Sequence, residues 1–186
     1  MEVINSRLKG ALLIKPKVFE DERGFFIEAY NKNKFKDITS VNPDFFQDNE
    51  SGSKRGSLRG LHFQKPPYTQ AKLVRVIVGE VQDVIVDMRS SSPTFGKWES
   101  YILNDKNKHQ LFIPRGFAHA FLTLSEYAIF NYKIDNSYHP DSDSGIAWND
   151  PDININWEMK TSDLILSEKD ASLQSFEEYC KNPDFS

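Results

Sequence analysis

An all-β fold, a jelly-roll sandwich or barrel, is predicted by three features of the sequence. Many short segments combine β-branched and aromatic residues and end at turn residues, helical periodicity is weak, and no low-complexity linker divides the chain. Many short strands with few helices are typical of sandwiches and barrels, whose open end can hold a small ligand. We therefore expect one domain over residues 1–186, with a few short peripheral helices.

The expected elements follow in chain order. Strands are predicted at 10–16, 24–30, 45–49, 57–64 and 97–103, where apolar residues alternate or run between turn signals. Two β-branched runs within 71–89 flank Gly79-Glu80 and predict a tight hairpin. A second strand pair is expected from 109–124 and 126–134, joined at Ser125-Glu126. Helices are expected at 33–38 and in the acidic tail at 171–180, so that segment 158–186 is partly helical.

Composition and charge exclude several classes of protein. The net charge of −4 argues against a protein that neutralises many nucleic-acid phosphates. Cys180 is the only cysteine, so no internal disulfide can form, and a cytoplasmic location is expected. The N-terminal apolar run Ala11 to Ile14 is too short for a signal-peptide core or a membrane span. No nucleic-acid or membrane partner is therefore expected.

Arg59 and His62 are the first candidates for a site. They lie in RGSLRGLHFQ, residues 55–64, with Gly60 between them. In a regular strand their side chains would point to opposite faces, and only a bulge at Gly60 would aim both into one pocket. A single histidine in a β protein is more often a hydrogen-bonded structural residue, and the spacing by itself leaves both interpretations open.

Lys72 and Tyr132 are two further candidates. Lys72 opens an apolar strand, and there it is either a solvated strand end or a cation that stabilises a developing oxyanion. Tyr132 shares strand parity with Ala128 and Phe130 and is expected to point inward with them. The common alternative for such a tyrosine is a core aromatic with a satisfied hydroxyl.

Residues 113–124 place His119 after a Pro-x-Gly turn and resemble the second motif of the cupin superfamily of jelly-roll barrels. Metal-binding cupins usually supply a His-x-His pair and a Glu from their first motif, and this sequence has no such pair. A transition-metal site normally needs three or more protein ligands, so four scattered histidines would have to converge in the fold. A cupin-type jelly roll without metal is the better prediction.

Nine collinear segments together resemble the dTDP-4-dehydrorhamnose 3,5-epimerase family. They carry motifs such as FFQDNES, SLRGLHFQ, QLFIPRGFAHAF and LSEKD, and they are spread along the chain at 19–30, 45–51, 57–64, 70–89, 91–98, 110–121, 131–133, 144–153 and 166–170. The resemblance implies an enzyme without cofactor or metal that converts dTDP-4-dehydro-6-deoxy-D-glucose into dTDP-4-dehydro-L-rhamnose. It also implies a homodimer whose N-terminal strands reach the neighbouring subunit.

Residue roles follow from the same resemblance. His62 would be the proton acceptor, Tyr132 the proton donor, Asp170 the partner that orients the histidine, and Lys72 the group near the C4 oxygen. The substrate-binding set that the resemblance implies is Arg23, Glu28, Gln47, Asp48, Asn49, Arg59, Lys72, His119, Asp143 and Lys169. From side-chain chemistry, the rings of Phe25, Phe26 or Tyr138 are added as candidates to stack on thymine.

The chemistry of such a substrate agrees with these residue types. A ketone at C4 acidifies the C–H bonds at C3 and C5, and an imidazole ordinarily ionises at a pKa of ~6.5, close to working pH. The planar guanidinium groups of Arg23 and Arg59 suit a pyrophosphate. Three alternatives stay open: a single-site 3- or 5-epimerase of another deoxysugar pathway, a sugar-binding cupin without catalysis, and a metal-dependent cupin.

Overall fold

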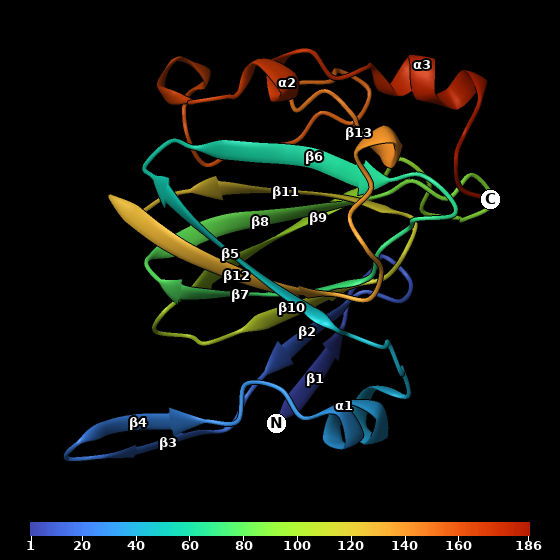
Figure 1. Ribbon diagram of the computed structural model, residues 1–186. Coiled ribbons are helices and arrows are strands. Elements are labelled where there is room, and N and C mark those ends of the chain that lie inside the picture. The colour runs from blue at the N-terminus through green and yellow to red at the C-terminus, as the bar shows by residue number, and fades with distance from the viewer.

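Two antiparallel sheets packed face to face form the body of the computed structural model, which describes residues 1–186 (Figure 1). The six-stranded sheet has the order β1 (Glu2–Asn5), β2 (Leu12–Lys15), β10 (Gln110–Ile113), β7 (Lys72–Val78), β12 (Tyr127–Ile134) and β5 (Gln47–Lys54). The five-stranded sheet has the order β13 (Asp143–Gly145), β6 (Leu58–Gln64), β11 (Phe117–Thr123), β8 (Glu80–Asp87) and β9 (Trp98–Asn104). The all-β jelly-roll prediction is confirmed.

Both predicted strand pairings are wrong, although the strands themselves exist. β7 pairs with β10 and β12, whereas β8 pairs with β11 and β9, so the chain crosses between sheets at Gly79. Gly79 has a φ of +83°, and a Cβ there would lie 2.2 Å from the Tyr127 carbonyl oxygen. Its N–H donates to the carboxylate of Asp105 at 2.8 Å. The chain changes sheet again at Ser125-Glu126, between β11 and β12.

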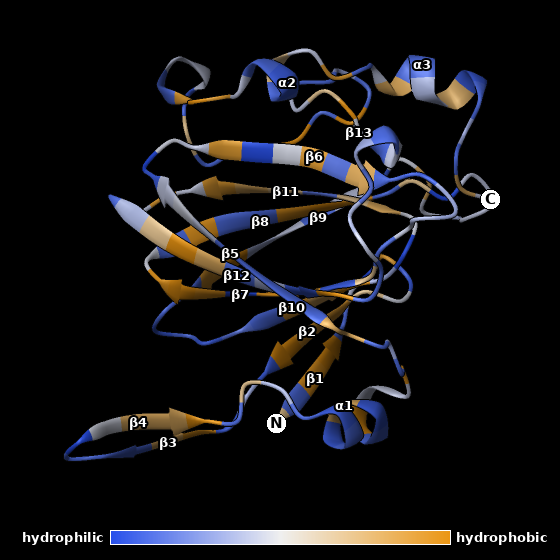
Figure 2. Ribbon diagram, viewed as in Figure 1, coloured by the Kyte–Doolittle hydropathy of each residue, from blue (hydrophilic) through white to orange (hydrophobic).

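Three apolar clusters explain the pattern of burial. The largest lies between the sheets and includes Val74, Ile85 and Phe130. A second lies between the five-stranded sheet and the C-terminal segment, where Ile153 and Tyr179 pack on the outer face. Because β11 is covered on both faces, all of its residues are buried, whereas β5 is hydrophilic (Figure 2). The third cluster seats Phe35 on the outer face of the six-stranded sheet.

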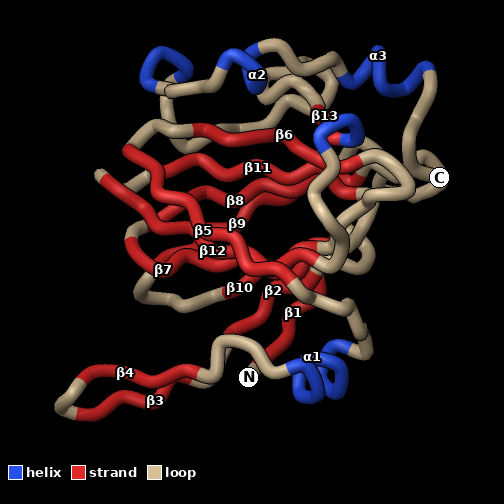
Figure 3. The backbone as a smooth tube through the Cα atoms, in the orientation of Figure 1, coloured by secondary structure: helices blue, strands red, loops and turns tan.

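Helices are few and lie outside the two sheets (Figure 3). α1 (Lys32–Thr39) confirms the helix expected at 33–38, and the Asn31 side chain caps it by accepting the Lys34 N–H. The tail is not one helix over 171–180, because α2 (Glu168–Ala171) ends early and Ser175 caps a new helix, α3 (Phe176–Lys181). No helix is long and apolar enough to cross a membrane.

A separate hairpin of β3 (Val18–Asp21) and β4 (Gly24–Ile27) projects away from both sheets (Figure 1). The sequence did not predict β3, and it also missed β1 and β13. Phe19, Phe25 and Phe26 on this hairpin are exposed, Phe26 by 67%. Adjacent exposed aromatic side chains of this size are typical of a surface that another protein covers.

Candidate active site

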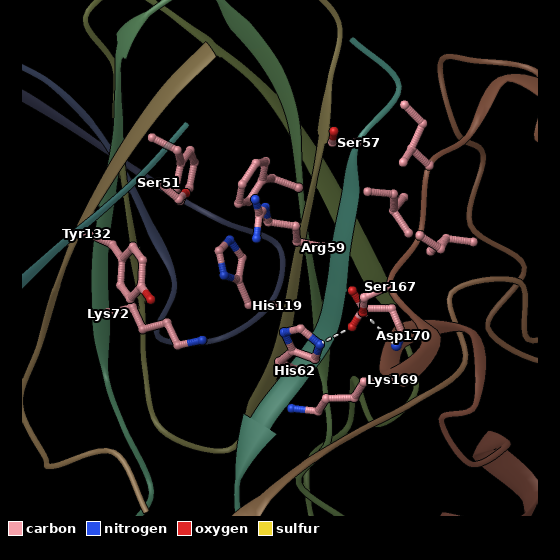
Figure 4. Close-up of a pocket in the computed structure, with 15 residues that line it drawn as sticks. Ser51, Ser57, Arg59, His62, Lys72, His119, Tyr132, Ser167, Lys169 and Asp170 are labelled. Atoms are coloured by element: carbon pink, nitrogen blue, oxygen red, sulfur yellow. Dashed lines mark hydrogen bonds and ion pairs between the residues drawn. The ribbon is translucent and has the colours of Figure 1, made fainter. Parts of the chain in front are cut away.

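One cavity of about 420 Å³ gathers most of the predicted catalytic residues (Figure 4). Its walls come from β5, β6, β7, β11 and β12 and from the segment that leads into α2. Seven residues singled out from the sequence line it: Arg59, His62, Lys72, His119, Tyr132, Lys169 and Asp170. These seven residues, which span 111 positions from Arg59 to Asp170, therefore share one site.

His62 on β6 forms a hydrogen bond through Nε2 with Oδ1 of Asp170 on α2. Asp170 is only 4% exposed, and its backbone N–H donates to the capping Ser167 hydroxyl at 3.1 Å, which fixes the carboxylate at the start of α2. Burial would raise the pKa of Asp170, but the hydrogen bond and charge of His62, together with Ser167 and Lys169, hold it below its usual value. An ionised Asp170 keeps the proton on Nε2, so Nδ1 remains a free base.

Arg59 and His62 share the cavity because β6 is irregular at Gly60. His62 lies opposite His119 and Arg59 opposite Phe121, so three steps along β6 match two along β11. Gly60 has a φ of +128°, and a Cβ there would lie 2.4 Å from the Ala120 Cβ. The bulge that a shared pocket would require is therefore present. Arg59 donates through Nε to the Ser53 hydroxyl at 3.1 Å and through Nη2 to the Gly52 carbonyl oxygen at 3.4 Å, which leaves the rest of its fork free.

Lys72 and Tyr132 come from the opposite sheet, on β7 and β12. Figure 4 shows the phenol and the ammonium on one side of the cavity, with the His62–Asp170 pair on the other. Burial lowers the pKa of Lys72 to about 8, against the raising effect of Asp83 and Asp143. Burial raises the pKa of Tyr132, so its hydroxyl stays protonated at neutral pH. The cavity thus holds a base, a cation and a proton donor.

Asp83 was missed by sequence reasoning. It lies on β8, is 0% exposed, and accepts a hydrogen bond at 2.9 Å from His119 Nε2. Its strand parity matches Val81 and Ile85, which lie in the core between the sheets, and this parity was the available signal. Burial raises the pKa of Asp83 and lowers the pKa of His119, while each partially offsets the shift of the other.

Tyr138, Asp143 and Lys169 are connected by hydrogen bonds. The Tyr138 hydroxyl donates to Asp143 Oδ2 at 3.0 Å, and the Lys169 ammonium contacts the same oxygen. Asp143 raises the pKa of Tyr138 through this hydrogen bond. Tyr138 keeps an exposed ring, 56% accessible, that is free to stack on a flat ligand.

The remaining predicted substrate-binding residues do not line this cavity within one chain. Arg23 and Phe26 lie on the β3–β4 hairpin, and Glu28 and Asp48 line a separate hollow on the six-stranded sheet. Gln47 donates to Asn49 at 2.8 Å on β5. No group of three or more His, Cys, Asp or Glu side chains is placed to hold a metal ion.

Chemically, the cavity is suited to moving protons beside a carbonyl group. A free imidazole nitrogen can remove a proton, an ammonium can stabilise the resulting oxyanion, and a phenol on the other side can return a proton. Because the ammonium is buried, its effect on an oxyanion is stronger than it would be in water.

Comparison with known proteins agrees with this chemistry. The sequence model described as dTDP-4-dehydrorhamnose 3,5-epimerase matches residues 5–178. The Escherichia coli dTDP-4-dehydrorhamnose 3,5-epimerase is 51% identical over 178 residues, 96% of each chain. A crystal structure of the Legionella pneumophila dTDP-6-deoxy-D-glucose-3,5-epimerase in complex with dTDP-4-keto-L-rhamnose matches with a TM-score of 0.91 and 44% identity, covering 95% of this chain and 93% of that one.

A 3′-monoepimerase is also similar, at lower identity. The enzyme from Streptomyces bikiniensis, in complex with dTDP-quinovose, has a TM-score of 0.88 and 29% identity, covering 95% of this chain and 88% of that one. The fold therefore spans both kinds of enzyme, while the sequence is nearer to the double epimerases. On the match over residues 5–178 and the 51% identity across nearly the whole chain, this protein belongs to the dTDP-4-dehydrorhamnose 3,5-epimerase family.

Proposed function

We propose that the protein inverts C3 and C5 of dTDP-4-dehydro-6-deoxy-D-glucose and so produces dTDP-4-dehydro-L-rhamnose. The observation that carries the proposal is the position of His62 and Asp170 opposite Tyr132, with the Lys72 ammonium in the same cavity. The family and the 51% identity to a 3,5-epimerase support the double reaction over a single inversion.

In the proposed mechanism, His62 Nδ1 removes the proton from the carbon next to the C4 ketone. The C–H electron pair forms a carbon–carbon double bond to C4, and the carbonyl π pair moves onto the oxygen. The resulting enolate oxygen accepts a hydrogen bond from the Lys72 ammonium. Tyr132 then donates its hydroxyl proton to the same carbon from the opposite face, which inverts the centre. His62 returns its proton to solvent, Tyr132 is reprotonated, and the same groups act on the second carbon.

The nucleotide half of the substrate needs different chemistry. Arg59 offers the part of its fork that Ser53 and Gly52 do not use, and guanidinium groups bind phosphate oxygens in pairs. The exposed ring of Tyr138 is assigned to the thymine base, and Lys169, Asp143 and His119 to polar groups of the sugar. No nucleic acid or membrane is part of the proposal, and the net charge of −4 agrees with that.

A second copy of the chain completes the site in this proposal. The β3–β4 hairpin projects from its own subunit with three exposed phenylalanines, and Arg23 at its turn is exposed and paired only with Asp21. Arg23 and Phe26 cannot serve their own cavity from this position, because they line a separate hollow on the hairpin. We therefore assign them to the neighbouring subunit's nucleotide site, within a symmetric homodimer.

Mixing two impaired variants tests this assignment. Arg23→Ala and His62→Asn proteins are each expected to be weak, but co-expressed subunits should regain about a quarter of wild-type activity, because random pairing restores one intact site in each heterodimer. Light scattering of the wild type should give twice the 21.5 kDa chain mass. A monomer mass, or no recovery on mixing, would contradict the shared site.

Heavy water provides the direct test of the reaction. When wild-type enzyme is incubated with dTDP-4-dehydro-6-deoxy-D-glucose in D₂O, the sugar should gain deuterium at both C3 and C5, because solvent reprotonates the catalytic residues between turnovers. NMR of the sugar ring measures the label at each carbon. Label at one carbon only would favour the single-site epimerase, and no label would refute proton abstraction altogether.

A further inference from the structure

We propose that Asp83 is a positioning residue of this site: its buried carboxylate fixes the tautomer of His119 and is the counter-charge of the Lys72 ammonium. The proposal rests on the function argued above and extends it to a residue that is not among those lining the active-site cavity.

Burial of Asp83 requires an explanation. The residue is completely inaccessible, and it lies on β8 between Val81 and Ile85 of the inter-sheet core. Its Oδ2 accepts from His119, but its Oδ1 is buried without any hydrogen-bond partner. A buried carboxylate with one unsatisfied oxygen destabilises a fold, so a compensating charge or a functional role is needed. The fold offers the ammonium of Lys72 as that charge.

The charges of Lys72 and Asp83 interact, although the two side chains do not form an ion pair. Asp83 raises the pKa of Lys72 and Lys72 lowers the pKa of Asp83, so their charges interact. No carboxylate oxygen lies within the 4.0 Å of an ion pair from the Lys72 nitrogen, although other lysines of the chain make such pairs. A direct pair would compete with the substrate for the ammonium. A carboxylate held back by His119 keeps the nitrogen charged and leaves its protons free for an enolate oxygen.

His119 gains a defined tautomer from the same carboxylate. Burial lowers the pKa of His119, so the ring is neutral at working pH, and its one proton lies on Nε2, where it is donated to Asp83. Nδ1 is then an acceptor. His119 lines the cavity and is therefore suited to accept a hydrogen bond from a sugar hydroxyl, and it does not add a second cation beside Lys72.

The sign of the expected pH effect follows from these charges. Burial already brings the pKa of Lys72 down to about 8, and Asp83 is the first of two carboxylates that oppose the fall, the other being Asp143. The remaining titratable groups around the cavity are Arg59, His62, His119, Tyr132, Lys169 and Asp170. Neutralising Asp83 lets the pKa of Lys72 fall further, so the ammonium is lost at a lower pH.

Asp83→Asn tests the counter-charge, because the amide keeps the shape of the carboxylate. We expect the alkaline limb of the kcat profile to move to lower pH by about one unit or more, with kcat at pH 8 reduced about 5-fold or more and the KM for substrate little changed. Asp87→Asn is the matched control. Asp87 lies on the same strand, is equally buried, and binds Arg89, Ser92 and Thr94.

Both variants are expected to lower the melting temperature, but only Asp83→Asn should move the alkaline limb. An unchanged limb in Asp83→Asn would show that the residue is structural only, and the proposal would fail. A wild-type measurement covers the case in which the variant does not fold: ¹⁵N NMR of the imidazoles should show His119 neutral with its proton on Nε2. A proton on Nδ1, or an imidazolium at pH 7, would overturn the tautomer assignment.

Failure of this proposal is distinguishable from failure of the function. Deuterium incorporation by the wild type reports on the reaction, whereas the shift of the alkaline limb and the His119 tautomer report on Asp83. Labelling at both carbons together with an unmoved limb would keep the reaction and reject the role of Asp83.

Discussion

His62→Asn is expected to lower kcat by about 10²–10⁴-fold, the usual contribution of a general base. The asparagine amide can still donate to Asp170, so the carboxylate stays paired and the fold is retained, but no lone pair of comparable basicity faces the sugar. Binding of dTDP should change little, because the nucleotide contacts are assigned to other residues. NMR in D₂O and calorimetry with dTDP measure the two effects separately.

Tyr132→Phe provides the contrast to that variant. With His62 intact, the proton can still leave and return on the same face, so deuterium should exchange into the starting sugar while inversion is lost. If His62→Asn retained exchange at both carbons, the base would be another residue and the mechanism would be wrong. If both variants behaved alike, the assignment of one residue to each face would fail.

Lys72→Met is expected to reduce kcat by about 10²–10³-fold, as does the loss of one donor to an oxyanion. Methionine fills a similar volume without a charge, so the cavity keeps its shape. The same ammonium predicts the alkaline limb of the wild type. Because the pKa of Lys72 is lowered to about 8, raising the pH through about 8 removes the charge and activity declines.

Lys72→Arg is the matched control, since a guanidinium stays charged at every pH at which the protein is folded. The arginine variant should keep part of its activity and lose the limb near pH 8. A wild-type profile that stays flat well above pH 8 would contradict the role of the ammonium, whatever the activity of Lys72→Met.

Strand locations were predictable, but strand partners were not. Alternation and β-branched runs are local properties, so β7, β8, β11 and β12 could be found from the sequence. The hairpin expected at Gly79 failed because glycine there serves a crossover between sheets, where no Cβ fits beside Tyr127. A tight turn and a crossover between sheets can both have glycine and a polar residue between two apolar runs. The packing of distant strands decides which of the two forms.

For the candidate site residues, too, local features could be predicted from the sequence and long-range contacts could not. Parity predicted that Tyr132 points inward, whereas the sequence left open whether Gly60 permits the bulge that brings Arg59 and His62 into one cavity. Asp83 was missed, because one aspartate in an apolar run matches no motif. Its hydrogen bond to His119 appears only when β8 and β11 pair in the folded sheet.

The sequence alone determined the all-β class, most of the strands and the residue types of an acid–base site. These features depend on local periodicity and side-chain chemistry. The tertiary structure alone decided which strands pair and that a buried carboxylate lies behind His119. The pairing of Asp170 with His62 followed from the family resemblance and not from any local pattern, and the structure shows it as a hydrogen bond. The physical reason is that long-range contacts are selected by the packing of two sheets and a C-terminal cover, which no local pattern encodes.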